Sequence, residues 1–589
     1  MRRPVAVVAL LLGLLQTGTA AQSAPKLVVI VVVDQMRADY LTRFAAHWRG
    51  GLKTLLTEGA VFENANYAHL LTVTCAGHAT IGTGTYPRTH GMISNAWWHR
   101  DTRTSPECTA DTKIPAVTYG AAVTTGSSPE RLLVPTLADE LRAQKPGARV
   151  VAVSLKSRGA IPLAGRAADA IAWFDDTAAT FTTSRAYTQA PVAEVKRFID
   201  ANPVEKQYGQ TWALLGPPGS YLQRDSGIGE RPPGGWTSIF PHVIAVPTPP
   251  APGRGRGAGR VVATIEPTPA VEAGPAGETT AAPAAAGRGT TSGSAAPAPP
   301  VVTVAQASGQ WQATPFADRY LARMALSLAD SFQLGRRTTT DFLSVSFSTL
   351  DDVGHAFGPD SREVEDILRH LDVTLGDFIT RLDTTVGRAN YVLAFSADHG
   401  VAPFSGMGGP GGRVHTEDIR DRIEELLVAT FGPREKLSYV DNSSSGYVYF
   451  ASGVAERVLN HPALMATIER EVKAIPGVTH VLRTDQLSET SRDPIVRAAA
   501  RTHVPGRGGE LLVVAREGWS LGGRGVFSAN HGTPYRYDTH VPVIFLGGGI
   551  KAVTTPAAAS PADVAPTLAL LAGVKLPKAE GRPLRDVRR

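Results

Sequence analysis

The chain of 589 residues contains only two cysteines, Cys75 and Cys108, no cluster of basic residues, and no long apolar run beyond its first residues. Two cysteines cannot build a disulfide scaffold, although they could pair with each other in an oxidising compartment. Because no later run is long and apolar enough to cross a bilayer, we expect no transmembrane segment. The basic residues are scattered and form no nucleic-acid-binding motif, so we expect no specific binding of nucleic acids.

The positive net charge of +6 is open to two interpretations. It could help to attract anionic substrates, or it could reflect nothing more than a solvated surface. The sequence contains no signal for the oligomeric state.

The first 20 residues are typical of a secretory signal peptide. Arg2 and Arg3 precede an apolar run from Val5 to Leu15, and small residues follow at Gly18, Thr19 and Ala20. The alternative is a buried N-terminal helix. We expect a secreted protein, located in the periplasm.

Residues 246–302 consist almost entirely of Ala, Pro, Gly, Thr and Arg. Such a composition cannot bury enough apolar surface to offset the ordering of the chain, so it predicts a disordered insertion. The rest of the chain suits one large catalytic domain with insertions better than several independent domains.

Apolar, β-branched runs alternate with amphipathic stretches along most of the chain. We expect strands at 26–33, 60–66, 149–155, 342–347, 391–396 and 543–546. We expect helices at 51–58, 133–142, 316–330, 362–382 and 562–571. This alternation predicts an α/β fold, a three-layer sandwich in which helices cover both faces of a mostly parallel sheet.

The stretch between His399 and His531 has a different pattern of expected helices and strands from the rest of the chain. It predicts a smaller α+β cap, after which the chain returns to the main sheet at 527–531. Within it, helices are expected at 417–431 and 463–472, and strands at 445–450 and 509–516. The predicted division is a signal peptide (1–20), a catalytic core in three parts (21–245, 303–402 and 526–589), the insertion (246–302) and the cap (403–525).

Carboxylates and imidazoles follow several of the expected strands. They are Asp34, Asp351, His355, Asp398, His399 and His531. Taken singly, each has an ordinary alternative as a turn former, a helix N-cap or a solvated helix start. Together, at strand ends that meet along one edge of a sheet, they favour a site for divalent metal ions.

Three further side chains point to phosphoryl transfer. Thr74 precedes a helix-like run, where a hydroxyl would lie at the positive end of the helix, and Lys156 and Arg158 follow an expected strand. A threonine hydroxyl is a poor nucleophile until a metal ion lowers its pKa. The alternatives are a simple N-cap for Thr74 and a solvated strand end for the two basic residues.

The segment from Thr74 to Asn95 carries the pattern T-x3-H-x2-I-x-T-G-x-Y-P-x2-H-G-x3-N. It resembles the nucleophile segment of type I phosphodiesterases and nucleotide pyrophosphatases, within the alkaline phosphatase superfamily. With a threonine nucleophile and a K-x-R pair, the chain is most similar to the branch of PafA-type periplasmic alkaline phosphatases. The resemblance runs from Leu27 to Asp563, fails over the insertion and is weak in the cap.

The resemblance implies a phosphate monoester hydrolase with two Zn²⁺ ions, acting on small phosphate esters through a phosphothreonine intermediate. One ion would be bound by Asp351, His355 and His531, and the other by Asp34, Asp398, His399 and Thr74. Asn95 and Arg158 would bind phosphoryl oxygens, and Lys156 would add charge near the attacking water. Asp352 and His540 are rival ligands to Asp351 and His531, whereas His78, His90 and Lys113 are assigned to structure.

Three alternatives remain. A phosphodiesterase or nucleotide pyrophosphatase would use the same fold, although the K-x-R pair favours a dianionic monoester. An inactive binding protein of this fold would not need the complete ligand set. A sulfatase or phosphonate hydrolase usually has Pro and Arg at fixed positions after its Cys or Ser, and these do not follow Cys75 at that spacing.

Overall fold

The computed structural model describes residues 24–227, 229–248, 301–404, 411–435, 437–524 and 529–588. The predicted signal peptide and all but the ends of the predicted insertion lie outside these residues. Within the described residues, no helix is long and apolar enough to span a membrane.

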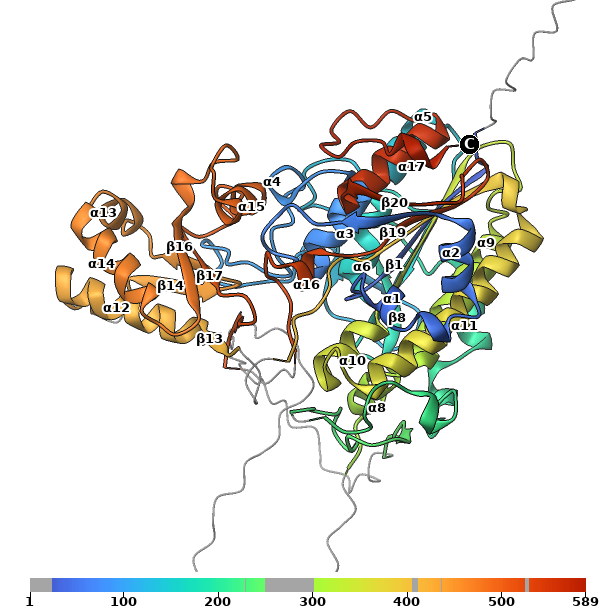
Figure 1. Cartoon of the computed structure of the whole chain (residues 1–589), viewed down its shortest axis with the longest axis horizontal. Coiled ribbons are helices and arrows are strands. Elements are labelled where there is room, and N and C mark those ends of the chain that lie inside the picture. Colours follow the sequence, from blue (N-terminus) through green and yellow to red (C-terminus); the bar gives the residue numbers. More distant parts are fainter. Residues whose placement is uncertain are drawn as a thin grey trace, which may run out of the picture.

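A ten-stranded mixed sheet forms the centre of the larger part of the molecule (Figure 1). Its strands lie in the order β20 (Val553–Ala559), β2 (Ala60–Ala65), β19 (Val543–Gly547), β12 (Tyr391–Ser396), β1 (Leu27–Val33), β11 (Asp341–Phe347), β6 (Val150–Ser154), β7 (Ala170–Asp175), β8 (Thr180–Ser184) and β4 (Ala116–Thr118). The five strands from β12 to β7 are parallel, and antiparallel pairs flank them on both sides.

Strand β1 lies at the centre and is buried along its whole length. Its alternate side chains enter two different cores, which explains the continuous apolar run in the sequence. The core on one face receives Leu27, Val29, Val31 and Val33. The core on the other face receives Val28, Ile30 and Val32.

Helices cover both faces of the sheet. The first face is packed against α2 (Gly51–Glu58), α7 (Ala193–Ala201), α9 (Pro315–Ser331), α10 (Thr349–Phe357) and α11 (Arg362–Thr385). The second is packed against α3 (Thr74–Thr83), α5 (Leu137–Gln144), α6 (Ser157–Ala164) and α17 (Val564–Ala572). Helix α8 (Val304–Gln312) also packs on the first face, and the four-residue helices are α1 (Tyr40–Arg43), α4 (Pro87–His90) and α16 (Arg536–Thr539). The predicted three-layer α/β fold is therefore confirmed.

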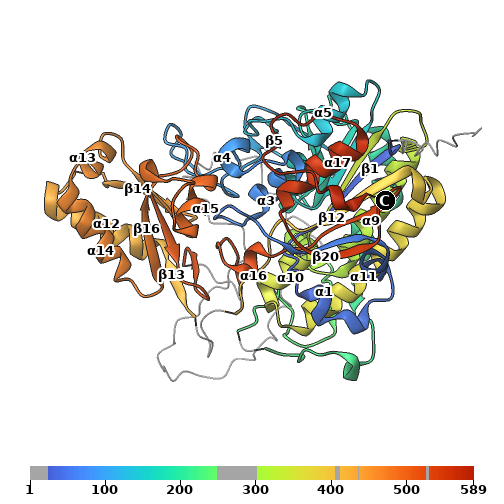
Figure 2. The ribbon, with the colours of Figure 1, turned by 45° about the horizontal axis from the view of Figure 1, so that its top comes forward.

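A second sheet lies to one side of the core, in orange in Figures 1 and 2. It is antiparallel, in the order β14 (Val440–Ser444), β15 (Tyr447–Phe450), β17 (Leu511–Ala515) and β16 (Val478–Arg483). Its helices are α12 (Thr416–Phe431), α13 (Ala455–Leu459), α14 (Pro462–Lys473) and α15 (Pro494–Thr502), and β13 (Arg413–His415) pairs with β18 (Ser520–Gly522). We call residues 411–524 the cap.

The cap has a core of its own and a second apolar contact with the larger part. One face of its sheet packs on α12 and α14. The other face places Tyr447 and Leu512 in a cluster with Leu70, Cys75 and Trp97 of the larger part. The cap therefore lies directly over the segments around the N-terminus of α3.

The predicted return of the chain to the main sheet at 527–531 is wrong for the described part of that range. Ala529, Asn530 and His531 form no strand, and the chain rejoins the sheet only at β19. Ala402 N donates to Asn530 O at 3.0 Å, so this loop is fastened to the turn after β12 instead.

Candidate active site

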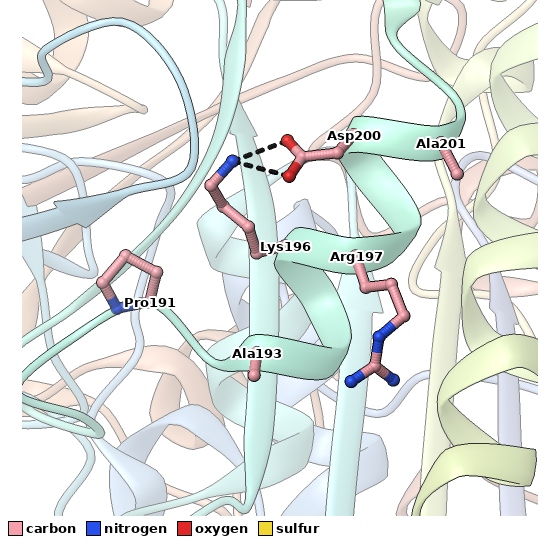
Figure 3. Close-up of a pocket in the computed structure, with 6 residues that line it drawn as sticks. All are labelled: Pro191, Ala193, Lys196, Arg197, Asp200 and Ala201. Carbon is pink, nitrogen blue, oxygen red and sulfur yellow. Dashed lines mark hydrogen bonds and ion pairs between the residues drawn. The ribbon is translucent and has the colours of Figure 1, made fainter.

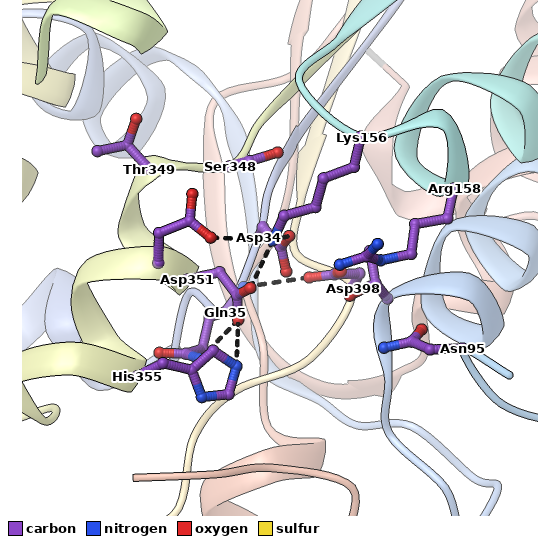
Figure 4. Close-up of polar contacts among 12 residues, drawn as sticks. Asp34, Gln35, Asn95, Lys156, Arg158, Ser348, Thr349, Asp351, His355 and Asp398 are labelled. Carbon is purple, nitrogen blue, oxygen red and sulfur yellow. Dashed lines mark hydrogen bonds and ion pairs between the residues drawn. The ribbon is translucent and has the colours of Figure 1, made fainter. Parts of the chain in front are cut away.

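Four parallel strands, β12, β1, β11 and β6, end at the same edge of the sheet, and each is followed by a predicted site residue. Asp34 follows β1, Asp398 follows β12, Lys156 follows β6, and Asp351 lies in α10 after β11. Figure 4 shows their side chains converging on one place. Parallel strands place their carboxyl ends together, so the topology itself assembles the site.

Two groups of side chains in the described residues are close enough to hold a metal ion. The first is Asp351, His355 and His531, as predicted. The second contains Asp34 and His399, but with Asp351 in place of the predicted Asp398. Asp398 nevertheless lies beside it, since His399 Nε2 is 3.4 Å from Asp398 Oδ2 and 3.3 Å from Asp34 Oδ1.

The three imidazoles are anchored in the same way. The Nδ1 atom of His355 lies 2.9 Å from Ala529 O, that of His399 lies 2.9 Å from Gly400 O, and that of His531 lies 2.9 Å from Thr72 O. A carbonyl can only accept a hydrogen bond, so each Nδ1 carries a proton, and in the neutral imidazole the Nε2 lone pair is the one left to bind a cation. Histidine ligands of metal ions are typically oriented by such a contact.

The acidic groups are buried and short of partners. Asp34 and Asp398 are fully buried, and Asp34 Oδ1, Asp398 Oδ2 and His399 Nε2 have no hydrogen-bond partner among the described residues. Burial, and then the nearby Asp34, raise the pKa of Asp398 well above its usual value. Buried carboxylates of this kind call for cations, so these residues fit divalent metal ions.

Gln35 contacts two carboxylates of the cluster, and the sequence analysis missed it. Its Nε2 donates to Asp351 Oδ1 at 2.6 Å, and its backbone N donates to Asp398 Oδ1 at 3.1 Å. This double contact requires a left-handed backbone, with φ of 66°. A Cβ on Gly354 would lie 1.8 Å from Gln35 Oε1, so a side chain at that position would displace the Gln35 amide. The sequence analysis did not single out Gln35, because Asp34, the residue before it, already accounted for the polar residue at this strand end.

Lys156 lies among the carboxylates. Its Nζ is 2.8 Å from Asp34 Oδ2 and 2.5 Å from Asp351 Oδ2, so it pairs with two carboxylates of the cluster. Burial lowers the pKa of this amine, but the surrounding carboxylates more than compensate, so it lies well above its usual value. The alternative of a solvated strand end is therefore wrong for Lys156.

Thr74 is the first residue of α3, is buried, and lies one position inside the helix. The N-cap position belongs to Val73, and no side chain caps this helix, so the alternative of an ordinary threonine cap is wrong. A Cβ on Gly77 would lie 2.1 Å from Asp398 O. The absence of a side chain at Gly77 lets the N-terminus of α3 approach Asp398.

Asn95 and Arg158 lie on the side of the cluster away from Asp351 and His355 (Figure 4). The amide nitrogen of Asn95 is turned toward the carboxylates. Asn95 Oδ1 accepts a hydrogen bond from Cys75 N at 2.9 Å, which leaves the amide N–H groups to donate elsewhere. Arg158 forms an ion pair with Glu107, a residue that the sequence analysis did not identify. Burial lowers the pKa of Arg158, but Glu107, Asp34 and Asp351 raise it above its usual value.

The structure also separates the rival residues. Asp352 is absent from both groups, and its Oδ1 lies 3.6 Å from Lys156 Nζ. His540 is directed to Glu63 O at 2.7 Å, away from the cluster. His78 contacts Asp398 Oδ2 at 3.2 Å and Ser346 Oγ at 2.8 Å, and so supports the site from behind. His90 is buried against Thr80, and Lys113 is exposed.

A surface hollow lies beside α7, and none of the predicted site residues lines it. It is lined by Pro191, Ala193, Lys196, Arg197, Asp200 and Ala201 (Figure 3). Its polar side chains are exposed, and Lys196 is already paired with Asp200. It brings together no group of catalytic chemistry, so the candidate site is the carboxylate and imidazole cluster.

Comparison with known proteins places this site in a family. The family described as type I phosphodiesterase / nucleotide pyrophosphatase matches residues 28–237 and 264–532. Alkaline phosphatase PafA of Elizabethkingia meningoseptica is 30% identical over 99% of this chain and 98% of its own length. Alkaline phosphatase PhoV of Synechococcus elongatus is 29% identical over 96% of this chain and 93% of its own length.

Solved structures agree. The crystal structure of wild-type PafA superimposes with a TM-score of 0.80 at 29% identity, covering 96% of this chain and 99% of that one. A solved PafA variant with substitutions of a threonine, an asparagine, a lysine and an arginine gives a TM-score of 0.79. The fold is thus the alkaline-phosphatase-like α/β fold. The chain belongs to the type I phosphodiesterase / nucleotide pyrophosphatase family, within the alkaline phosphatase superfamily of phosphoester hydrolases.

Proposed function

We propose that the protein is an alkaline phosphatase, which hydrolyses small phosphate monoesters through a phosphothreonine intermediate at a site for two zinc ions. One observation carries this proposal. A buried acidic and imidazole cluster lies at one sheet edge beside the helix N-terminus of Thr74, and Lys156, Arg158 and Asn95 lie around the same place.

Two sets of residues would hold the ions. Asp351, His355 and His531 form one set, and Asp34, Asp398 and His399 form the other, with the Thr74 hydroxyl. The unpartnered Asp34 Oδ1, Asp398 Oδ2 and His399 Nε2 support this assignment. Bound zinc ions would lower the pKa of the Thr74 hydroxyl and neutralise the negative charge of the departing oxygen.

The residues of the chain divide the reaction between them. Thr74 Oγ1 attacks phosphorus as its proton passes to solvent, and the bond to the ester oxygen breaks. The alcohol leaves with a proton taken from solvent, and the phosphoryl group is now carried by Thr74. Water then attacks the phosphothreonine, which releases inorganic phosphate and restores the hydroxyl. Asn95 and Arg158 donate hydrogen bonds to the non-bridging oxygens throughout, and the first N–H groups of α3 favour the same negative charge.

The substituted PafA variant supports the choice of residues. Its four substituted residues, Thr, Asn, Lys and Arg, are separated by 21, 62 and 2 residues. Thr74, Asn95, Lys156 and Arg158 occur in the same order, separated by 21, 61 and 2 residues. The relatives named alkaline phosphatases match over nearly their whole length, which supports the same activity here.

A phosphodiesterase or nucleotide pyrophosphatase is the principal alternative, since the family name covers it. A monoester carries two negative charges on its non-bridging oxygens, which suits two cationic side chains, whereas a diester carries one and brings a second bulky group. The test is to compare an aryl phosphate with its methyl diester on the zinc-loaded protein. A higher kcat/KM for the monoester supports the proposal, and a higher value for the diester establishes the alternative.

An inactive binding protein of the same fold would hydrolyse neither substrate in that assay.

We also propose that the protein acts in the periplasm. Cys75 and Cys108 form a disulfide, which suits an oxidising compartment. The division into a signal peptide, a three-part core, an insertion and a cap belongs to the same proposal.

A further inference from the structure

The disulfide between Cys75 and Cys108 lies beside Asn95. Cys75 N donates to the side-chain oxygen of Asn95 at 2.9 Å, and Cys108 N donates to its backbone oxygen at 2.7 Å. Both half-cystines thus hold the same residue, one by its amide group and one by its main chain. Cys75 also follows Thr74 directly at the start of α3.

The same disulfide reaches the second phosphate-binding side chain through its neighbour. Glu107 precedes Cys108 and forms the ion pair with Arg158. Glu107 also accepts a hydrogen bond from Ser157 Oγ at 3.3 Å, and its backbone bridges to Ala96, next to Asn95. Glu107 therefore has a fixed position between the two residues.

The surroundings leave little freedom for this arrangement. Cys75 and Cys108 are fully buried and pack in the apolar cluster with Met92, Ile93 and Trp97 beneath the cap sheet. The bond joins residues 33 positions apart. Without it, the segment around Cys108 would keep its apolar contacts but lose its covalent connection to the N-terminus of α3.

We propose that the Cys75–Cys108 disulfide is a positioning element for phosphoryl binding, which fixes Asn95, and through Glu107 also Arg158, relative to Thr74. This inference rests on the proposed function. The ordinary alternative is that the bond only stabilises the fold by restricting the unfolded chain. The two roles predict different rates for protein that remains folded. A positioning role predicts slower catalysis after loss of the bond, because a small misplacement of a binding group reduces catalysis, whereas a purely stabilising role predicts an unchanged rate.

The test is a double-mutant cycle between the disulfide and Asn95. Cys75→Ala/Cys108→Ala is combined with Asn95→Ala, and kcat/KM for an aryl phosphate is measured on folded, zinc-loaded protein with the zinc content recorded. We expect removal of the disulfide to lower kcat/KM about tenfold or more in the wild-type background, but by a clearly smaller factor when Asn95 is already alanine, because only the contribution through Arg158 then remains. Equal factors in both backgrounds, or unchanged rates in the first, would overturn the proposal.

Two controls keep the result specific. Ile93→Val removes one methylene from the same apolar cluster and should lower thermal stability without changing kcat/KM. If the double alanine variant does not fold, the purified wild type can be unfolded and refolded in the presence of a phosphine, which reduces the buried bond and leaves both side chains in place. The cycle is then read from reduced and oxidised samples, with the same expectations.

A second readout separates this inference from the proposed function. The affinity for inorganic phosphate is measured by calorimetry on the same variants, and should weaken more on loss of the disulfide when Asn95 is present than when it is alanine. Wild-type protein without turnover would overturn the proposed function, and the phosphate affinities would still decide the disulfide's role. Wild-type protein that neither turns over nor binds phosphate would overturn both.

Discussion

The two sides of the candidate site are held in position by different means. On the metal side, Asp34, Asp398 and His399 lie at the ends of buried strands, and backbone carbonyls orient the imidazoles. On the phosphoryl side, Asn95 lies in a loop and Arg158 in the first turn of α6, held by a disulfide and by Glu107. The metal side is therefore fixed by topology, whereas the phosphoryl side depends on a few side-chain contacts.

This contrast means that the two sides should respond differently to substitution. Changes on the metal side should alter the binding of ions, because the carboxylates and imidazoles converge on the place where a cation would bind. Changes on the phosphoryl side should alter the preference among substrates, because those side chains meet the part of the substrate that varies. The predictions below are arranged by the size of the effect that we expect.

Thr74 lies where the two sides meet, so its loss should have the largest effect. Thr74→Ala should reduce turnover of an aryl phosphate by on the order of 10³-fold or more, because the proposed nucleophile is removed. The zinc content should stay near that of the wild type. Thr83→Ala, at the other end of α3, is the matched control and should keep its activity. Near-normal multiple turnover by Thr74→Ala would exclude it as the nucleophile.

On the phosphoryl side, Lys156→Ala/Arg158→Ala should lower kcat/KM for a monoester about 10²- to 10³-fold. The loss for the matching diester should be much smaller, since the diester has less charge to be stabilised and gains space. Both substrates are measured at one pH and one salt concentration, with Lys196→Ala as a control for a surface charge. If both rates fall by the same factor, the pair does not determine specificity.

On the metal side, Gln35→Ala should weaken zinc binding about 10- to 100-fold, because it removes the amide that donates to Asp351, while the backbone contact with Asp398 is kept. The affinity is measured by competition with a chelator. Activity should return to near the wild-type value when zinc is in excess. An unchanged affinity would show that the strand ends alone fix the ligands.

Glu363 is a buried carboxylate outside the site, and it shows what burial costs where no metal ion is expected. Burial, and then Asp225, raise its pKa to about 8, while Arg362 opposes this and Asp366 adds to it. Its Oε1 lies 3.1 Å from His242 Nε2, and Glu230 is also nearby. Because the folded pKa is above the usual value, the folded protein binds this proton more tightly than the unfolded chain does, and stability falls as the pH rises toward 8.

Glu363→Gln keeps the shape of the protonated form and should remove this loss. Compared with the wild type, the variant should gain up to about 5 kcal/mol in free energy of unfolding at pH 9, which corresponds to the difference between a pKa of about 8 and the usual 4.5, and little at pH 5. Urea unfolding at both pH values measures the difference, with the exposed Glu469→Gln as a control. A constant difference between variant and wild type across this range would contradict the expectation.

Much of the fold could be predicted because buried parallel strands give continuous apolar runs. The predicted strand at 391–396 and helix at 51–58 have the bounds that β12 and α2 show, and most others differ by a few residues. The edge strand β20 escaped prediction because it contains Pro556 and is only half-buried. An edge strand tolerates proline, since one side of its backbone needs no partner.

The candidate site, like the fold, could be predicted only in part from the sequence. Strand ends at one sheet edge were enough to predict that Asp34, Asp351, Asp398 and His399 lie close together. Gln35 and Glu107 could not be predicted, because their contacts depend on a left-handed backbone and on the approach of a distant loop. The pairing of Cys75 with Cys108 was left open for the same reason. The catalytic roles of all these residues stay predictions.

The central claim is that Thr74 takes up the phosphoryl group before water does. The stereochemical course at phosphorus tests it most directly, using an aryl phosphate made chiral with oxygen isotopes and an alcohol as acceptor. Two successive displacements, one by Thr74 and one by the acceptor, predict overall retention of configuration. Inversion would show a single direct displacement and would contradict the phosphothreonine intermediate.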